Sequence, residues 1–550
     1  MGENGDQLLQ TPCRPGNAVR PGRIGATMQR RTFLAGLAPS AAALALGSLF
    51  APGQGRGGVE RLPAGSGYPF TLGVASGMPG SSSVVLWTRL APQPMEPLGG
   101  LPNAPIAVRW ELAEDEAFRA VLRSGEILAR AAHAHSVHVE VEGLPSDRRF
   151  FYRFHAGDAT SPVGRTRTAP AADAPVGRLR LALASCQHYE QGAYTLHREI
   201  AATDLDLVVF VGDYIYESSN PRYRLRPHEG GTPRTLAGYR RRHATYKLDG
   251  ALRDAHAAHP WLVTWDDHEV ENDYADDASR FDERSPEALL RLRAAAYKAY
   301  FEHMPVSPSM APAGPSMLIH AHHRWGQLAD LWTLDNRQYR SPPPCSKPGR
   351  AGGQALINCP TIGEPARSMF GTAQERWIGG ELAASAARWR LLAQATQIAP
   401  AGIDTPIGRS LYSDGWDGYP AARARLLGAI AAQPKGNVVC LGGDVHRHVA
   451  ARLRADPLDP RSAVVASEFV TSSLTSRGLS EAMTALMLNS NPDMLHARSD
   501  ERGYALLEVG PERVACTFRA TPFPVRPESR IGTQAVWVVE RGEPGPQRDA

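Results

Sequence analysis

The chain has 550 residues, of which 43% are hydrophobic and 21% are charged, so it is long enough for more than one folded domain and is not a disordered chain. Its formal net charge of +4 is too small to indicate a specific nucleic-acid partner, because the basic residues are spread along the whole chain. The composition is ordinary for a folded soluble protein.

The N-terminal region predicts export. Residues 1–58 begin with a Gly-, Pro- and Arg-rich stretch, within which Met28 is an alternative start. Residues 30–34 place paired arginines before Phe-Leu and an alanine-rich apolar run, which is the pattern of a twin-arginine export signal. A membrane anchor or a buried helix is the alternative, but the run is short for a stable membrane span. We therefore expect the twin-arginine machinery to export the protein to the periplasm or the extracellular space.

Residues 66–170 predict a small β domain. Short β-type runs alternate with turns at residues 70–74, 83–88, 106–112, 137–141 and 149–154. The run around His138 alternates strictly between apolar and polar residues, and this spacing is typical of an antiparallel sandwich. We expect an immunoglobulin-like domain without catalytic residues, then a catalytic domain at residues 176–525 and a C-terminal tail at residues 526–550.

The second domain contains buried-type strands that each end in polar residues. These strands are residues 179–184 before Cys186, 208–211 before Asp213, 261–265 before Asp267, 328–334 before Asp335, and 437–441 before Asp444. The order strand, helix, strand predicts a mixed or parallel α/β sheet, in which the carboxyl ends of parallel strands share one edge. We therefore expect these residues to meet there. His448, which follows the last strand, is interpreted as a surface residue.

Asp213 and Tyr216 lie three residues apart directly after a buried strand. A carboxylate and a phenolate are hard oxygen donors, which suit an oxidised iron or a similar metal. The alternative is an aspartate that accepts backbone N–H bonds in a turn.

The cysteines differ in context. Cys345 and Cys359 flank a Pro/Gly-rich loop and form a disulfide candidate in an exported protein. Cys440 and Cys516 lie in apolar strands and are interpreted as buried thiols, which leaves Cys186 unpaired.

A helix is predicted further along the chain. Residues 372–375 have the capping-box pattern of a helix start, and Trp377, Leu382 and Trp389 follow at helical spacing.

Three short motifs carry a family resemblance. They are Gly212-Asp213-x-x-Tyr216, Asp267-His268-Glu269 and Gly443-Asp444-x-His446, and they resemble a variant of the metallophosphoesterase signature. Together with Ser185-Cys186 and the twin-arginine leader, they make residues 66–525 similar to the PhoD-type alkaline phosphatase/phosphodiesterase family. The resemblance implies a metallophosphoesterase-type αββα sandwich preceded by an immunoglobulin-like β-sandwich.

The resemblance also implies a metal set, because the family is held to use Fe³⁺ with Ca²⁺. The implied ligands are Cys186, Tyr216 and His446 for iron, Asp213 as a bridge, and Asp267, Asp444 and Asn272 for calcium. Asp267 and Asp444 stand where the general signature has Asn and His. These replacements exchange nitrogen for oxygen donors and so favour a hard cation such as Ca²⁺.

The implied chemistry is hydrolysis of a phosphoester. Two cations neutralise the phosphate, and a metal-bound water becomes a usable nucleophile at moderate pH. His268 is placed to protonate the leaving oxygen. Arg226 resembles the family's phosphate-contacting arginine, with Arg222 and Arg224 as alternatives.

We therefore expect an exported, monomeric, metal-dependent phosphomonoesterase or phosphodiesterase. A phospholipase D-like diesterase on the same site is one alternative, and a secreted calcium-binding protein without catalysis is another. The second alternative does not explain Cys186, Tyr216 and His268, because a structural Ca²⁺ site needs no thiolate, phenolate or imidazole.

Overall fold

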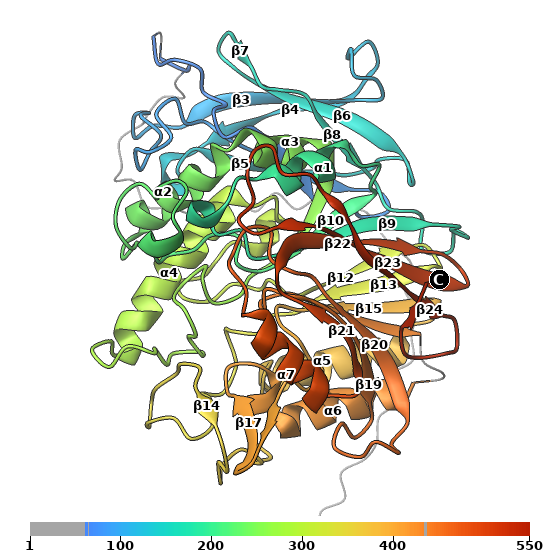
Figure 1. The fold of residues 1–550 in the computed structure, drawn as a ribbon. Helices are drawn as coiled ribbons and strands as arrows, with labels where there is room; N and C mark the ends of the chain where they lie inside the picture. The colour runs from blue at the N-terminus through green and yellow to red at the C-terminus, as the bar shows by residue number, and fades with distance from the viewer. Residues whose placement is uncertain (1–60, 64, 434–436, 550) are drawn as a thin grey trace, which may run out of the picture. The chain divides into compact units, whose positions relative to one another are not determined.

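The computed structural model of the protein describes residues 61–63, 65–433 and 437–549 (Figure 1). The predicted export signal lies outside these described residues. Within them, no helix combines the length and the apolar character that crossing a bilayer requires.

The first of two large mixed sheets carries the strands that precede Cys186, Asp213 and Asp267. Its strand order is β25 (Gln547–Arg548), β24 (Gly532–Glu540), β23 (Arg513–Pro522), β22 (Glu501–Val509), β9 (Leu179–Ala184), β10 (Leu207–Val211), β11 (Pro260–Thr264), β1 (Val74–Gly77), β2 (Val84–Arg89) and β5 (Ser136–Val141). Strands β9, β10 and β11 are parallel, with Val209 opposite Leu183 and Leu262.

The second large sheet carries the strand that precedes Asp444. Its order is β12 (Ala321–Trp325), β13 (Ala329–Thr333), β15 (Trp389–Ala393), β18 (Val438–Gly442), β20 (Val464–Val470), β19 (His448–Arg454) and β21 (Met494–Arg498). Strands β13, β15, β18 and β20 are parallel. The strands β14 (Ala355–Leu356), β17 (Gly408–Tyr412) and β16 (Ile403–Thr405) form a separate small sheet.

Apolar side chains bind the two large sheets face to face. Leu183, Val209 and Leu262 of the first sheet share one buried cluster with Leu391 and Leu441 of the second. These strands are apolar on both faces, as parallel strands covered on both sides require. The outer face of each sheet packs against helices.

The helices belong to two groups. Side chains of α1 (Thr195–Ala202), α2 (Leu236–Lys247), α3 (Gly250–Ala258) and α4 (Pro286–His303) pack on the first sheet, and those of α5 (Gly371–Ala384) and α6 (Pro420–Ala431) pack on the second. A further helix, α7 (Glu481–Ser490), follows β20 in the chain. Ser285 and Ser480 cap α4 and α7 by accepting a backbone N–H bond of the first turn.

The N-terminal part of the chain is joined to the first sheet. Strand β1 pairs in parallel with β11, so residues 66–170 contribute β1, β2 and β5 to the first sheet. The rest of this region forms a separate five-stranded sheet of β4 (Val121–Ala129), β3 (Ile106–Ala113), β6 (Arg149–Ala156), β7 (Ala159–Thr160) and β8 (Gly164–Arg167). Phe70, Val84, Ile106 and Phe150 lie in the core between these layers.

Three sequence predictions require correction. Residues 526–550 are no tail, because Gly532–Glu540 forms β24 and pairs with β23. The proposed capping box is wrong, since α5 begins at Gly371 and Trp389 lies in β15. His448 is buried and stacks on Phe518 at 4.5 Å between ring centroids.

The cysteine predictions are confirmed. Cys345 and Cys359 form a disulfide. Cys186, Cys440 and Cys516 are buried free thiols.

Candidate metal centre

The polar residues that end the strands converge because the strands are parallel and two glycines permit close approach. A Cβ atom at Gly443 would lie 2.5 Å from the Ser185 hydroxyl, so glycine allows the end of β18 to reach the end of β9. Gly212 has a φ of +101°, and its Cβ would lie 2.6 Å from that of Asp266. The two sheets therefore contribute residues to one centre.

The first ligand group consists of Cys186, Asp213 and His446, whose donor atoms all lie within 4.8 Å of one another. Cys186 and Asp213 come from the first sheet, and His446 comes from the second. All three residues have positive φ values of 59°, 58° and 53°. Non-glycine residues adopt this conformation at a cost and cluster in it at functional sites.

Tyr216 joins this group through its hydroxyl. The hydroxyl donates to Asp213 Oδ2 at 2.8 Å, accepts from Ser476 Oγ at 2.8 Å and lies 3.1 Å from His446 Nε2. Burial and the charges of Asp213 and Cys186 raise the pKa of the Tyr216 hydroxyl well above its usual value. Burial and the Asp213 carboxylate likewise raise the pKa of the Cys186 thiol.

A cation fits this donor set. Asp213 Oδ1 is buried and has no hydrogen-bond partner among the described residues, which leaves a carboxylate oxygen free for a ligand. His446 Nδ1 donates to the Arg477 carbonyl at 2.8 Å, and this bond fixes the tautomer in which Nε2 is free to bind a metal. A bound cation would lower the pKa values of the Cys186 thiol and the Tyr216 hydroxyl, because it stabilises their ionised forms.

The second ligand group shares Asp213 with the first and adds Asp267 and His268. His268 Nδ1 donates to Glu217 Oε2 at 2.6 Å, so Nε2 is the nitrogen left for a proton or a ligand. Burial would lower the pKa of His268, but the carboxylates of Glu217, Asp267 and Asp213 outweigh it and raise that pKa well above its usual value. The imidazole is therefore held in its protonated form in the protein without a cation.

The third ligand group, Asp267, Asp273 and Asp414, extends the centre beyond the sequence prediction. All three carboxylates are buried. Asp273 lies six residues after Asp267 and donates its backbone N–H to that carboxylate at 2.6 Å. Asp414 follows no parallel strand, so its chain position gave no signal of its place here.

Two predicted calcium ligands lie beside these groups. Asp444 has a φ of 62°, and its Oδ2 accepts from the Thr396 hydroxyl at 2.6 Å. Burial and the charge of Asp267 raise the pKa of Asp444 to about 6. The backbone N–H of Asn272 donates to Glu217 Oε1 at 3.1 Å, which places Asn272 next to the His268 pair.

Arg226 is engaged with other residues. It donates to the Tyr189 carbonyl at 2.7 Å and to Asp249 Oδ2 at 2.6 Å, and its guanidinium lies over the Tyr189 ring. Its predicted phosphate contact stays a prediction.

Arg337 is the buried counter-charge of the carboxylates. It binds Asp414 with two hydrogen bonds of 3.0 and 2.8 Å, also donates to Asp266 Oδ1, and lies 3.5 Å from Asp267. The side chain is 1% exposed. One guanidinium thus offsets the mutual repulsion of three acids.

Replacing Arg337 with methionine should destabilise the protein by about 3–5 kcal/mol, because the buried carboxylates would lose their counter-charge. Chemical denaturation measures the loss. Arg425→Met is the matched control, because the Arg425 side chain is 40% exposed in its pair with Glu375 and such pairs contribute at most about 1 kcal/mol. Equal losses in both variants would contradict a special role for Arg337.

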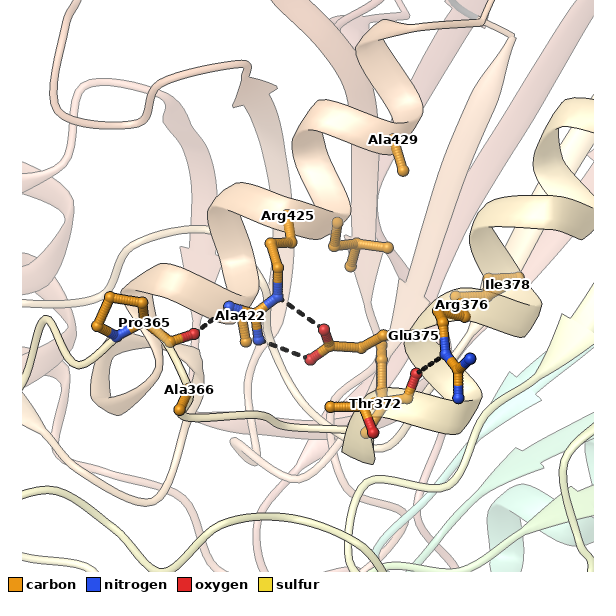
Figure 2. A pocket seen from close by; sticks show the side chains of 11 residues that line it. Pro365, Ala366, Thr372, Glu375, Arg376, Ile378, Ala422, Arg425 and Ala429 are labelled. Atoms are coloured by element: carbon orange, nitrogen blue, oxygen red, sulfur yellow. Dashed lines mark hydrogen bonds and ion pairs between the residues drawn. The ribbon is translucent and has the colours of Figure 1, made fainter. Parts of the chain in front are cut away.

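The control pair lies in a cavity of about 440 Å³ between α5 and α6 (Figure 2). Figure 2 shows Arg425 bound to Glu375 and to the Pro365 carbonyl. None of the ligand groups contributes to its lining. Glu375 and Arg425 bind each other, and Arg376 donates to the Thr372 carbonyl, so this cavity is not part of the centre.

Comparisons with known proteins identify the family. The family model of the PhoD-like phosphatase matches residues 181–518, and that of the PhoD-like phosphatase N-terminal domain matches residues 59–170. The chain belongs to the PhoD-like phosphatase family. It is 42% identical to alkaline phosphatase D of Bacillus subtilis (strain 168) over 527 residues, which cover 94% of this chain and 89% of that protein.

A solved structure agrees with this assignment. The structure of PhoD matches with a TM-score of 0.84 and 41% identity, covering 89% of this chain and 94% of the solved chain. As a PhoD-like phosphatase, the protein is a phosphoric ester hydrolase. The family resemblance inferred from the motifs is confirmed, and a calcium-binding protein without catalysis is disfavoured.

Proposed function

We propose that this PhoD-like phosphatase is an exported hydrolase that cleaves phosphomonoesters or phosphodiesters with bound Fe³⁺ and Ca²⁺. Asp213 carries the proposal, because it belongs to two ligand groups at once and can therefore bridge two cations. We further propose that the two large sheets with their helices form the αββα sandwich of metallophosphoesterases, and that residues 66–170 are immunoglobulin-like.

The two cation positions differ in their donors. Cys186, Tyr216 and His446 offer sulfur, phenolic oxygen and nitrogen, which suit iron. Asp267 and Asp444 offer carboxylates, which suit calcium, with Asn272 as a further ligand and Asp273 and Asp414 as additional carboxylates. When bound, the cations supply positive charge for the phosphate oxygens and lower the pKa of bound water.

Side chains of the protein supply the proton for the leaving group and fix the position of Asp213. His268 donates a proton from Nε2 to the leaving oxygen, and Glu217 holds its ring in place through Nδ1. Glu269 orients the centre, because its carboxylate accepts from the backbone N–H groups of Asp213, Tyr214 and Asp266. These bonds fix the turn in which Asp213 lies.

Metal analysis of the purified protein, beside turnover of a chromogenic monoester and a chromogenic diester, tests the function. Turnover of either ester with iron and calcium present supports it. The absence of both metals from an active enzyme would contradict the cation assignment.

Calcium chelation should abolish activity reversibly. Carboxylate ligands exchange Ca²⁺ readily, whereas a thiolate and a phenolate hold iron longer. The measurement is turnover before chelation, after it and after the return of Ca²⁺. Mg²⁺ should restore less activity, because it demands a smaller octahedral site. Full activity with calcium shown to be absent would contradict a catalytic Ca²⁺.

A further inference from the structure

A cavity of about 580 Å³ opens directly beside the metal centre. Asp444 and His446 are among its lining residues, together with the exposed cation Arg477. This size is in the range of small-molecule sites. The cavity therefore reaches two of the proposed metal ligands.

The remaining wall of the cavity is mostly apolar. Leu479, Met483 and Met487 come from α7 and the segment before it, and Leu411 and Tyr412 come from β17. Asp417, also in the lining, is already paired with Arg423 at 2.7 Å. Arg447, the other charged residue of this wall, is buried and donates to Gln397 Oε1 at 2.7 Å.

Several of these side chains are exposed in spite of their apolar character. Tyr412 is 55% exposed, Leu479 44% and Met483 39%. Single exposed apolar residues are common, but a group that gathers around one cavity indicates a binding surface. Methionine side chains are flexible and polarisable, so Met483 and Met487 can adapt to ligands of different shape.

We infer that this cavity binds the apolar organic group of the phosphoester substrate, such as an alkyl or aryl group, while the phosphate lies at the Asp444 and His446 end. This inference rests on the proposed function and names its substrate class. A polyol such as a sugar or glycerol gains little from burial against Leu479 and Met483. An alkyl group gains about fourfold in affinity for each buried methylene.

Equilibrium binding of alkylphosphonates to the holoenzyme tests the inference, because their C–P bond is not an ester and is not hydrolysed. Methyl-, butyl- and octylphosphonate share one headgroup and differ only in apolar length. From methyl to butyl, calorimetry should show affinity rising by a factor on the order of ten to a hundred. An affinity that does not change with chain length overturns the inference.

Variants of α7 locate the effect. Met483→Ser and Met487→Ser should each weaken octylphosphonate binding by roughly fivefold to tenfold and leave methylphosphonate binding unchanged. Leu486→Ser is the matched control, because Leu486 lies on the same helix, is 49% exposed and does not line the cavity. Equal weakening by Leu486→Ser would overturn the assignment to this cavity.

Turnover of methyl p-nitrophenyl phosphate separates this inference from the proposed function. Chain-length-dependent binding without turnover of any ester would contradict the proposed function and support the cavity assignment. Turnover with no effect of chain length on phosphonate binding would contradict the cavity assignment alone.

Discussion

Replacing His268 with alanine should lower turnover by roughly 10²–10⁴, the usual contribution of general acid catalysis. Glu217 Oε2 accepts from His268 Nδ1 at 2.6 Å and fixes the ring with Nε2 free, so the variant removes a positioned proton donor. The loss should be smallest for esters whose leaving group is a weak base, because such a group departs without a proton. Steady-state kinetics across a series of leaving groups measures this dependence.

Metal content decides between an acid and a ligand at this position. His268 also belongs to a ligand group with Asp213 and Asp267. If the alanine variant retains both metals, His268 acts on the substrate. If the variant loses a metal, or if its turnover falls by the same factor for every leaving group, His268 is not the general acid. Glu217→Gln serves as the control, because it keeps the imidazole but removes the charge that orients it. Its turnover should fall by a smaller factor than that of His268→Ala.

Replacing Tyr216 with phenylalanine should bleach or shift a visible absorption band of the purified protein. A phenolate bound to Fe³⁺ transfers charge to the metal under visible light, whereas Ca²⁺ and Zn²⁺ give no such band. The variant removes one hydroxyl, which contacts Asp213, His446 and Ser476. The fold should persist, because the ring can still pack against the rings of His188 and His268. Absorption spectroscopy before and after reduction with dithionite measures the band.

Tyr246→Phe is the matched control for the colour. Its hydroxyl is also buried near this site, but it contacts the backbone N–H groups of Tyr189 and Tyr216 and the His228 ring instead of Asp213 or His446. This variant should keep the band. A colourless, fully active wild-type enzyme without iron would refute the phenolate assignment, and Tyr216 would then be a hydrogen-bonding residue of the loop.

The sequence predicted those residues of the centre that directly follow a buried strand. Cys186, Asp213 and Asp267 each follow a buried strand, and parallel strands bring their carboxyl ends to one edge of a sheet. His446 was found in the same way from the other sheet. The short motifs around these residues also carried the family resemblance, which the comparisons confirmed.

The residues that the sequence did not reveal depend on contacts between distant parts of the chain. Asp414 reaches Asp267 through the buried Arg337, and no local pattern joins these positions. Ser476 is a partial exception, because a small polar run follows the apolar strand β20 and ends at this residue. Reading that strand as a further member of the parallel set would have placed Ser476 near the centre.

The failed helix start has a physical explanation as well. Thr372 and Glu375 fit a capping box, but Gly371, with a φ of +73°, is already the first residue of α5, so the N-cap is Phe370, two residues before Thr372. Trp389 had helical spacing by coincidence, since Ser385 ends the helix and Trp389 belongs to the next strand. Spacing alone does not show where a helix ends.

The pairing of β1 with β11 has a consequence for how the protein is made. Residues 74–77 are synthesised long before their partner residues 260–264. The interval is even longer between β9 and its partner β22 at residues 501–509. Until then, strand edges of the first sheet lack their partners and can pair with other chains. Contacts between such distant residues slow folding, so the sheet should close only after synthesis is nearly complete. Truncating the chain before β22 should therefore yield aggregation and not a smaller folded enzyme.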